Sequence, residues 1–182
     1  METISSLKPN VSCEDAVLQF LRQGVAARVR SVFRGPLRSV ALVHIPFRLF
    51  RIEISNRGRR ELRWLALDAV AGTFDPYAFD GEISPNSLVH VATRNCPPAT
   101  VPSEETQRLI TEKVRRLVFG SGFFRIRDLS IHARAVPLDF HVPYWVGFFG
   151  SGQAARFAVI DAVRRCFEGP KVRSFFYDWL RQ

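Results

Sequence analysis

The sequence predicts an α+β fold: two tandem α-β-β-β pseudo-repeats with antiparallel sheets, helices on one face and a C-terminal helix. Three observations predict it. Two segments resemble each other, each begins with a helix-initiation signal, and in each the apolar residues first recur at helical spacing and then alternate as in strands. The chain has 182 residues, 47% of them hydrophobic, which is enough apolar material for a sizeable core.

The internal similarity covers both arms of a predicted hairpin. Residues 43–49 (VHIPFRL) match 140–146 (FHVPYWV) at a shift of 97, and residues 63–70 (RWLALDAV) match 156–163 (RFAVIDAV) at a shift of 93. The loop between the arms is therefore four residues shorter in the second copy. An even difference keeps every side chain on its original face, because strand side chains alternate with period two. We therefore predict a duplicated β-hairpin.

The first copy begins with a helix signal. Ser12 stands before two acidic residues, and a hydroxyl accepts hydrogen bonds from the first free amides while acids complement the helix dipole. Apolar residues recur at helical spacing as far as Phe33, with Gly24 as a weak point or a break, so we expect either one helix or two short ones. Because Pro46 has no amide hydrogen, we expect it to interrupt the following strand and divide it in two. The expected strands are 37–45, 50–55 and 62–69, with the hairpin turn at 56–58.

The second copy repeats this order. Ser103, again before two acidic residues, predicts a helix that Gly120 caps. Pro170 opens a C-terminal helix whose apolar residues share one face, and such a face must dock onto a core. The expected strands are 129–135, 142–149 and 156–163, with the hairpin turn at 150–152.

These elements divide the chain into four parts that we expect to form one compact globule. A proline-rich linker separates the copies, and a flexible N-terminus precedes the first. The expected parts are the N-terminus 1–10, repeat 1 at 11–76, the linker 77–102, and repeat 2 with the C-terminal helix at 103–182.

Cysteine use and the N-terminal sequence predict a cytoplasmic protein with no membrane segment. The three cysteines, Cys13, Cys96 and Cys166, cannot all pair, and we expect Cys166 to be a small core residue. The first ten residues lack the basic and apolar regions of a signal peptide, and no apolar run approaches about 18 residues.

The hairpins resemble those of PepSY-type and related uncharacterised bacterial domains. The resemblance rests on the Pro-aromatic start of the strand and on a return arm that ends Asp-Ala-Val-x-Gly at 68–72. In the second copy it rests on 143–146 and 161–163, although 164–165 is Arg-Arg where the turn glycine should be. The resemblance covers mainly the two hairpins. It implies a small α+β module that binds a ligand or partner, with no catalytic residues to carry over.

Arginine supplies most of the positive charge of the chain. There are 26 Lys and Arg residues against 17 Asp and Glu, a formal charge of +9. The densest cluster lies along the first hairpin, where arginines on a β-ribbon could hold phosphates and Trp64 or Phe47 could stack on bases. The alternative is a solvated hairpin whose charged edge prevents strand-to-strand aggregation. The clustered residues are Arg48, Arg51, Arg57, Arg59, Arg60 and Arg63.

Two histidines and two aspartates stand at equivalent places in the copies, where they could line a polar groove between the repeats. They are His44 and His141, and Asp68 and Asp161. Paired carboxylates would suit acid–base catalysis, but we expect each aspartate to accept the amide hydrogens of a turn. We expect each histidine to bond backbone groups freed by the nearby proline. Their spacing fits no metal-binding pattern, so we expect no metal and no cofactor.

The strand around Trp145 is apolar on both faces, over residues 143–149. Such a strand is either covered on both sides or exposed for a partner. Trp145 is therefore a candidate partner contact, and a homodimer is one way to cover it.

Sequence motifs give no reaction class. Patterns typical of a serine nucleophile, a phosphate-binding loop or a zinc hydrolase do not occur in the chain. We therefore expect a non-catalytic module that binds a protein or small ligand at the groove between the repeats. Two alternatives stay open: binding of nucleic acid or phosphate through the Arg-rich hairpin 57–63, and an enzyme whose convergent site follows no motif.

Overall fold

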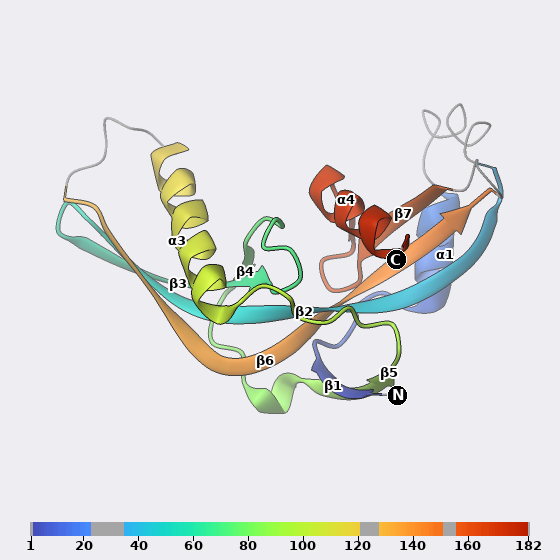
Figure 1. Cartoon of the computed structure of the whole chain (residues 1–182), viewed down its shortest axis with the longest axis horizontal. Coiled ribbons are helices and arrows are strands. Elements are labelled where there is room, and N and C mark those ends of the chain that lie inside the picture. The colour runs from blue at the N-terminus through green and yellow to red at the C-terminus, as the bar shows by residue number, and fades with distance from the viewer. Residues whose placement is uncertain (1, 23–34, 121–127, 151–155, 182) are drawn as a thin grey trace. The chain divides into compact units, whose positions relative to one another are not determined.

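The computed structural model describes residues 2–22, 35–120, 128–150 and 156–181, and it confirms the α+β class (Figure 1). In this part of the chain no helix is long and apolar enough to cross a membrane. The helices are α1 Cys13–Leu21, α3 Ser103–Gly120 and α4 Pro170–Trp179, with a 3₁₀ turn at Pro85–Ser87. The strands are β1 Glu2–Ser6, β2 Leu37–Asn56, β3 Arg59–Asp68, β4 Tyr77–Phe79, β5 Val89–Thr93, β6 Ser130–Phe149, β7 Arg156–Asp161 and β8 Cys166–Phe167.

The start of α1 is the one that the sequence predicts. Its cap is Ser12, whose hydroxyl oxygen accepts a hydrogen bond from the amide of Asp15 at 3.1 Å. In α3, by contrast, Ser103 is the first helical residue, and the carbonyl of Pro102 accepts from the amide of Thr106. The expected continuation of the first helix to Phe33 and the tip of the second hairpin at 151–152 lie outside the described residues.

The sheet has the strand order β4-β3-β2-β6-β1-β5, with β7 paired to β6 and β8 to β7. Strands β2 and β6 are both 20 residues long. β2 pairs with β3 in antiparallel register from Phe47↔Asp68 to Asn56↔Arg59, without a bulge. β6 pairs with β7 in the same sense, from Tyr144↔Asp161 to Phe149↔Arg156. The first hairpin turns at Arg57 and Gly58, which both have positive φ (55° and 72°), as a two-residue turn of this kind requires.

The expected break at Pro46 is wrong, because β2 runs through it without interruption. A proline removes only a donor: the carbonyl of Pro46 still accepts the amide hydrogen of Ala69 at 2.9 Å. In β6, Pro143 likewise accepts from Ala162 at 3.0 Å, and the strand also continues through Pro137. Within each predicted copy, one long strand therefore takes the place of the first two expected strands.

Contacts between Cα atoms group the chain into two compact units. Unit 1 contains residues 1–45, 89–96 and 142–182, and unit 2 contains residues 46–88 and 97–141. Each unit thus takes material from both predicted copies, because β2 and β6 both contribute to both units. The tandem duplication and its boundaries stay a prediction.

In unit 1, α1 and α4 cover opposite faces of the β6–β7 pair. Phe20 of α1 packs in one cluster with Trp145 and Phe149. Phe176 of α4 lies against the ring of Tyr144, with centroids 6.2 Å apart. Consecutive strand residues point to opposite faces, so the two helices lie on either side. The expectation that all helices share one face is therefore wrong for unit 1, since both faces of this strand pair are apolar and both need cover.

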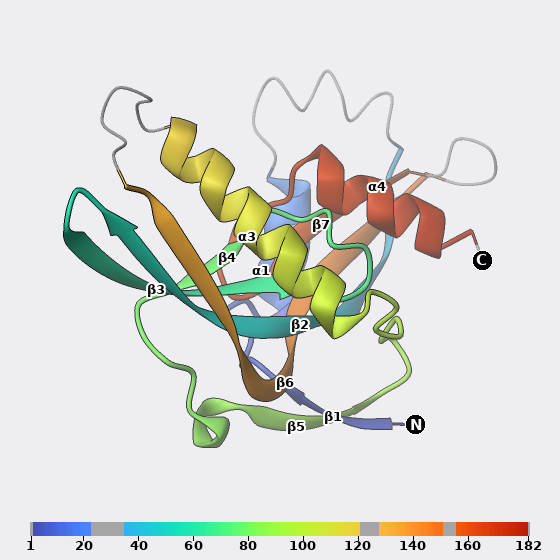
Figure 2. The same ribbon diagram turned by 60° about the vertical axis from the view of Figure 1, so that its left-hand side comes forward.

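In unit 2, α3 lies across β2 and β3 (Figure 2). Ile110 and Val114 of α3 pack on Phe50, Ile52 and Leu67 of the strands, all of them buried. The other side of β2 carries an aromatic cluster near the middle of the strand. Its members are Phe47, Phe74, Tyr77, Phe79 and Phe140, with ring centroids 5.1–6.3 Å apart.

Two segments outside the predicted repeats form a strand pair in unit 1. Glu2–Ser6, within the expected flexible N-terminus, is β1, and it pairs with β5 from the expected linker. The side chains of Ile4 and Ser6 are buried, which gives the N-terminal strand a reason to dock.

At Gly147 the ring of Phe20 from α1 packs closely on the sheet. A Cβ atom at this position would lie 2.9 Å from two ring carbons of Phe20. We expect Gly147→Val to lower the free energy of unfolding of unit 1 by about 2–3 kcal/mol, because overpacking forces the ring out of its site. Urea denaturation measures the loss.

Gly81→Val is the matched control, since nothing lies within 4 Å of a Cβ at Gly81. Adding Phe20→Leu to Gly147→Val should recover part of the loss by making room for the valine. Equal unfolding midpoints for Gly147→Val and Gly81→Val would contradict the close packing of α1.

Candidate functional site

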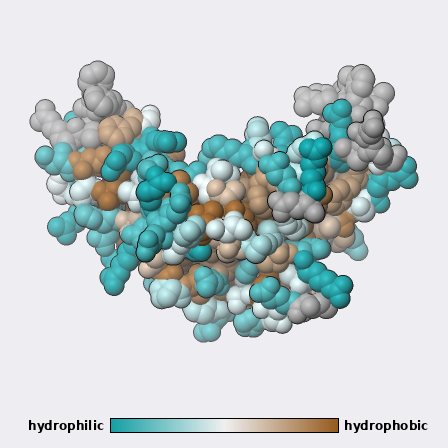
Figure 3. Space-filling view, in the orientation of Figure 1, coloured by the Kyte–Doolittle hydropathy of each residue, from teal (hydrophilic) through white to brown (hydrophobic). Residues whose placement is uncertain are grey.

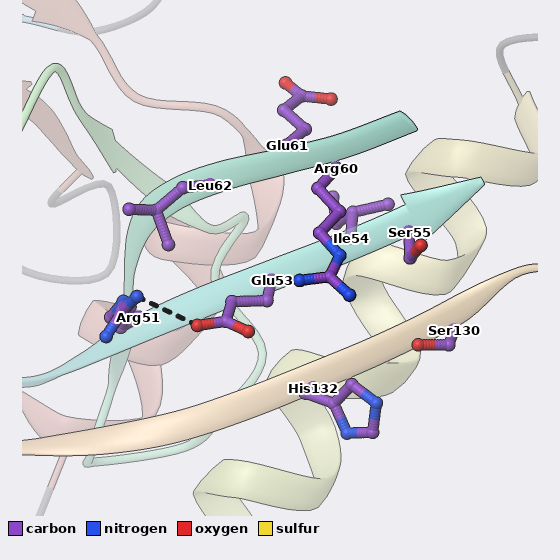
Figure 4. Close-up of a pocket in the computed structure, with 9 residues that line it drawn as sticks. All are labelled: Arg51, Glu53, Ile54, Ser55, Arg60, Glu61, Leu62, Ser130 and His132. Atoms are coloured by element: carbon purple, nitrogen blue, oxygen red, sulfur yellow. Dashed lines mark ion pairs between the residues drawn. The ribbon is translucent and has the colours of Figure 1, made fainter. Parts of the chain in front are cut away.

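A polar groove of about 530 Å³ lies on the sheet of unit 2 (Figure 4). Strands β2, β3 and β6 all contribute side chains to it. The aromatic cluster occupies this side of β2 only near Phe47, so side chains from Arg51 onward meet solvent. We call this surface the polar sheet face. It consists of Arg51, Glu53, Ser55, Arg60, Leu62, Ser130 and His132, and Ile54 and Glu61 also line the groove.

Strand alternation decides which residues reach the polar sheet face. Along β2, Phe50, Ile52 and Ile54 point under α3, so the residues between them point the other way. The register with β3 places Glu53 opposite Leu62 and Ser55 opposite Arg60. Because directly opposite residues of an antiparallel pair share a face, the buried side of the hairpin fixes the composition of its exposed side.

The polar sheet face offers charges of both signs. Arg51 and Glu53 form an ion pair at 2.9 Å, with 42% and 58% of their side chains exposed. Such an exposed pair stabilises by only about 0–1 kcal/mol, so a ligand can displace it at little cost. In Figure 4 the side chain of Arg60 extends over β2 toward Glu53, and His132 borders the groove from β6. Together with the 48% exposed Leu62, these groups suit a partner with both polar and apolar contacts.

The predicted arginine cluster is divided between the two sides of the hairpin. Arg59 and Arg63 lie with Glu61 in a second groove, of about 430 Å³, which also contacts Leu117 of α3. Arg63 forms an ion pair with Glu61 at 2.6 Å. We call this the α3-side groove; Figure 3 shows hydrophobic side chains at this end of α3, beside the hydrophilic hairpin. The cluster that is dense along the chain is therefore not one patch.

The remaining arginines of the cluster have other surroundings. Arg48 is half-buried and donates hydrogen bonds to the carbonyl of Val101 and the hydroxyl of Thr106, which ties β2 to the first turn of α3. Arg57 is exposed at the hairpin turn. Of the six predicted residues, only Arg51 and Arg60 belong to the polar sheet face.

Both predicted aspartates hold turns, as the local interpretation of the sequence expects. Each is fully buried at the end of a returning strand, and its carboxylate accepts backbone amide hydrogens. The donors to Asp68 are the amides of Ala71, Gly72 and Phe74 (2.8, 2.7 and 2.9 Å), and the donors to Asp161 are those of Val163 and Arg164 (2.8 Å each).

The two histidines are placed differently. His44 is buried, and its backbone amide donates to the carbonyl of Asn95 at 2.9 Å, whereas His141 is half-buried. His44 and Asp161 belong to unit 1, while His141 and Asp68 belong to unit 2. Each unit thus contains the histidine of one predicted copy and the aspartate of the other.

Trp145 is an interior residue of unit 1. It is 9% exposed, and its indole N–H donates to the carbonyl of Val11 at 2.9 Å. Its neighbours Tyr144 and Val146, on the other face of the strand, are buried as well. Of the two alternatives for this apolar strand, cover on both sides within the chain is the one the structure shows.

Sequence reasoning missed the contribution of β6 to the site. Ser130 and His132 alternate with Ile131 and Ala133, which pack on the core under α3, so the pattern of one wet face is readable in the sequence. The sequence does not reveal which strand β6 lies beside. That information is needed to bring these two residues to the arginines of the first hairpin.

In the described part of the chain, no three His, Cys, Asp or Glu side chains lie close enough together to hold a metal ion.

Burial raises the pKa of the Cys96 thiol, with a further contribution from Glu2. Burial also raises the pKa of Cys166, followed by the charges of Asp161 and Glu168. The expectation that Cys166 is a core residue is wrong, because it lies exposed in the two-residue strand β8.

Asp68→Asn should destabilise unit 2. The carboxylate oxygens accept three backbone N–H groups, but an amide has one acceptor oxygen and would turn an NH₂ group toward a buried donor. We expect a loss of about 2–3 kcal/mol in the free energy of unfolding, measured by urea denaturation. The control, Asp80→Asn, changes an exposed residue. Equal midpoints for the two variants would contradict the structural role of Asp68.

Comparison with known proteins gives no assignment: no family model, no curated protein and no solved structure matches the chain. The resemblance to PepSY-type hairpins therefore stays a prediction. A function has to be argued from the geometry of the two grooves and from the residues that the fold itself does not use.

Proposed function

We propose that this chain is a non-catalytic binding module that recognises its partner through the polar sheet face of unit 2. The observation that carries the proposal is the contrast between the two sides of one hairpin. One side is buried under α3, while the other presents charges of both signs, hydroxyls and a half-exposed leucine in a groove of about 530 Å³.

Two physical arguments support this choice of site. The strands that carry the polar sheet face are fixed by their buried side, so binding would require little ordering of the backbone. In addition, the exposed ion pair Arg51–Glu53 contributes little to stability, so these residues are not explained by the fold alone. The proposal keeps the cytoplasmic location and bacterial type expected from the sequence. A homodimer is not part of it, because the strand that suggested one is covered within unit 1.

A photoreactive residue placed at Ser130 tests the proposal. Ser130 lines the polar sheet face, so irradiation in an extract of the cells that make the protein should give a discrete covalent adduct. The same residue at Arg115, on the exposed side of α3 in the same unit, should give none. Gel electrophoresis detects the adducts and mass spectrometry identifies them.

Specificity is checked with the double variant Arg60→Glu with Leu62→Asp. It reverses one charge and removes the apolar contact of the polar sheet face, and it should abolish the Ser130 adduct. Adducts of the same kind from Ser130 and Arg115, or an adduct that survives the double variant, would contradict the proposed site.

Nucleic acid or phosphate binding is the second candidate, favoured by Arg59 and Arg60 near the hairpin turn. Both are exposed and form no ion pair with any described residue, unlike Arg51 and Arg63. The distribution of charge weakens this candidate. In the full sequence, unit 2 has 13 Lys and Arg against 11 Asp and Glu, a balance of +2, whereas unit 1 has 13 against 6, a balance of +7.

Salt dependence tests the second candidate. If Arg59 and Arg60 hold two phosphates of single-stranded DNA, the logarithm of the binding constant should fall by about 1.4 for each tenfold rise in salt. Engagement of all six hairpin arginines would make the slope about 4. Fluorescence anisotropy with a labelled oligonucleotide measures both.

The charge-reversing pair Arg59→Glu with Arg60→Glu should abolish this binding. The matched control is Arg115→Glu with Arg116→Glu, which makes the same charge change on the exposed side of α3. A flat salt response, or equal loss in the two double variants, would exclude the hairpin as a nucleic-acid site.

A further inference from the structure

One edge of β3 has no neighbouring strand over half of its length. β2 pairs with all ten residues of β3 on one side, but β4 pairs only with Trp64–Ala66 on the other. No strand among the described residues pairs with Arg59–Arg63 on that side. Figure 2 shows this end of the β2–β3 hairpin projecting beyond β4. We call Arg59–Arg63 the open edge of β3.

The hairpin register determines which backbone groups face outward from the open edge. In a hairpin with a two-residue turn, the residues that flank the turn exchange backbone hydrogen bonds, here Asn56 and Arg59. Every second residue after Arg59 therefore points its N–H and C=O toward β2. The N–H and C=O groups of Arg60 and Leu62 point away from β2. Those of Trp64 and Ala66 point the same way, and there they pair with β4.

The open edge lacks most of the features that prevent another strand from adding to a sheet. It contains no proline, its ten-residue register with β2 has no bulge, and neither a helix nor a loop among the described residues pairs with it. In the part of the chain that the structure describes, charge is its only protective feature. Charge selects among partners as well as repelling them, because it disfavours like-charged strands and favours strands of opposite charge.

The charge of the open edge favours an acidic partner. Glu61 is already paired with Arg63, which leaves Arg59 toward the α3-side groove and Arg60 toward the polar sheet face. A strand added beside β3 would bring its side chains level with these arginines, alternately on the two faces. A strand with carboxylates at such positions would gain two ion pairs in addition to the backbone hydrogen bonds.

We propose that the open edge of β3 binds an extended acidic peptide segment of a partner protein as an added β-strand. The N–H and C=O groups of Arg60 and Leu62 supply the backbone hydrogen bonds, and Arg59 and Arg60 select for carboxylates. This inference rests on the proposed function and names its partner, because Arg60 and Leu62 also belong to the polar sheet face. Addition of a strand to a sheet edge is a common mode of peptide recognition.

Leu62→Pro is the decisive variant. Proline at this position removes one of the two outward amides of the open edge, and its ring obstructs an added strand there, but it leaves the hydrogen bonds between β3 and β2 in place. The probe is a ten-residue peptide of alternating Glu and Thr with blocked ends. We expect saturable binding by the unmodified protein, weakened roughly tenfold or more by Leu62→Pro, since backbone hydrogen bonds are lost. Isothermal titration calorimetry measures the affinity.

Leu62→Ala is the matched control, since it removes the same side chain but keeps the amide, and its affinity should stay within about threefold of the unmodified protein. A peptide of alternating Lys and Thr should not bind. An alternating Glu and Thr peptide that is N-methylated at every second residue should not bind either. The methylated peptide tests backbone pairing without altering the protein, so the result does not depend on whether Leu62→Pro folds.

Absence of saturable binding by the Glu and Thr peptide would overturn the inference. Equal binding of the methylated peptide would overturn it too, since the contact would then be side-chain charge alone. The Ser130 adduct separates this failure from failure of the proposed function. An adduct that persists in Leu62→Pro, with no peptide binding, leaves the polar sheet face as the site and removes strand addition. Peptide binding without a Ser130 adduct would support strand addition at the open edge and would contradict the polar sheet face as the partner site.

Discussion

The strict alternation of side chains along β2 and β3 is the constraint on which the structure of unit 2 depends. Phe50, Ile52 and Ile54 must all face α3. A slip of one residue in the pairing with β3 would move these side chains to the face that is exposed to solvent. The same register sends Arg60 to one side of the hairpin and Arg59 to the other. The packing of the core thus determines the chemistry of both grooves.

Local features of the fold could be predicted from the sequence because their physical causes are local. The cap at Ser12, the turn at 57–58 and the aspartate turns each depend on residues within a few positions of one another. The matched registers Phe47↔Asp68 and Tyr144↔Asp161 agree with the two shifts on which the predicted duplication rests. The duplication itself stays a prediction, since similar local geometry also arises when two hairpins meet the same packing requirements.

The composition of the candidate site could not be predicted, because it depends on which strands are neighbours. Counting arginines along 48–63 ignores the period of two that divides them between opposite sides. Ser130 and His132 reach the polar sheet face only because β6 lies beside β2, a pairing between segments about 80 residues apart in the chain. The predicted break at Pro46 failed for a related reason. The effect of a proline on a strand depends on whether its carbonyl finds a hydrogen-bond donor, and here the donor is the amide of Ala69, which is distant in the sequence.

Unit 1 is built from segments that are far apart in the sequence, and this affects how the chain folds while the ribosome synthesises it from the N-terminus. Phe20 of α1 is made early, but Trp145 and Ile160, which cover it, emerge more than a hundred residues later. At about 5–20 residues per second this wait is on the order of ten seconds, far longer than a helix or hairpin needs to form. Throughout that interval the apolar face of α1 is available to chaperones, so the nascent chain has a binding site that the finished protein buries.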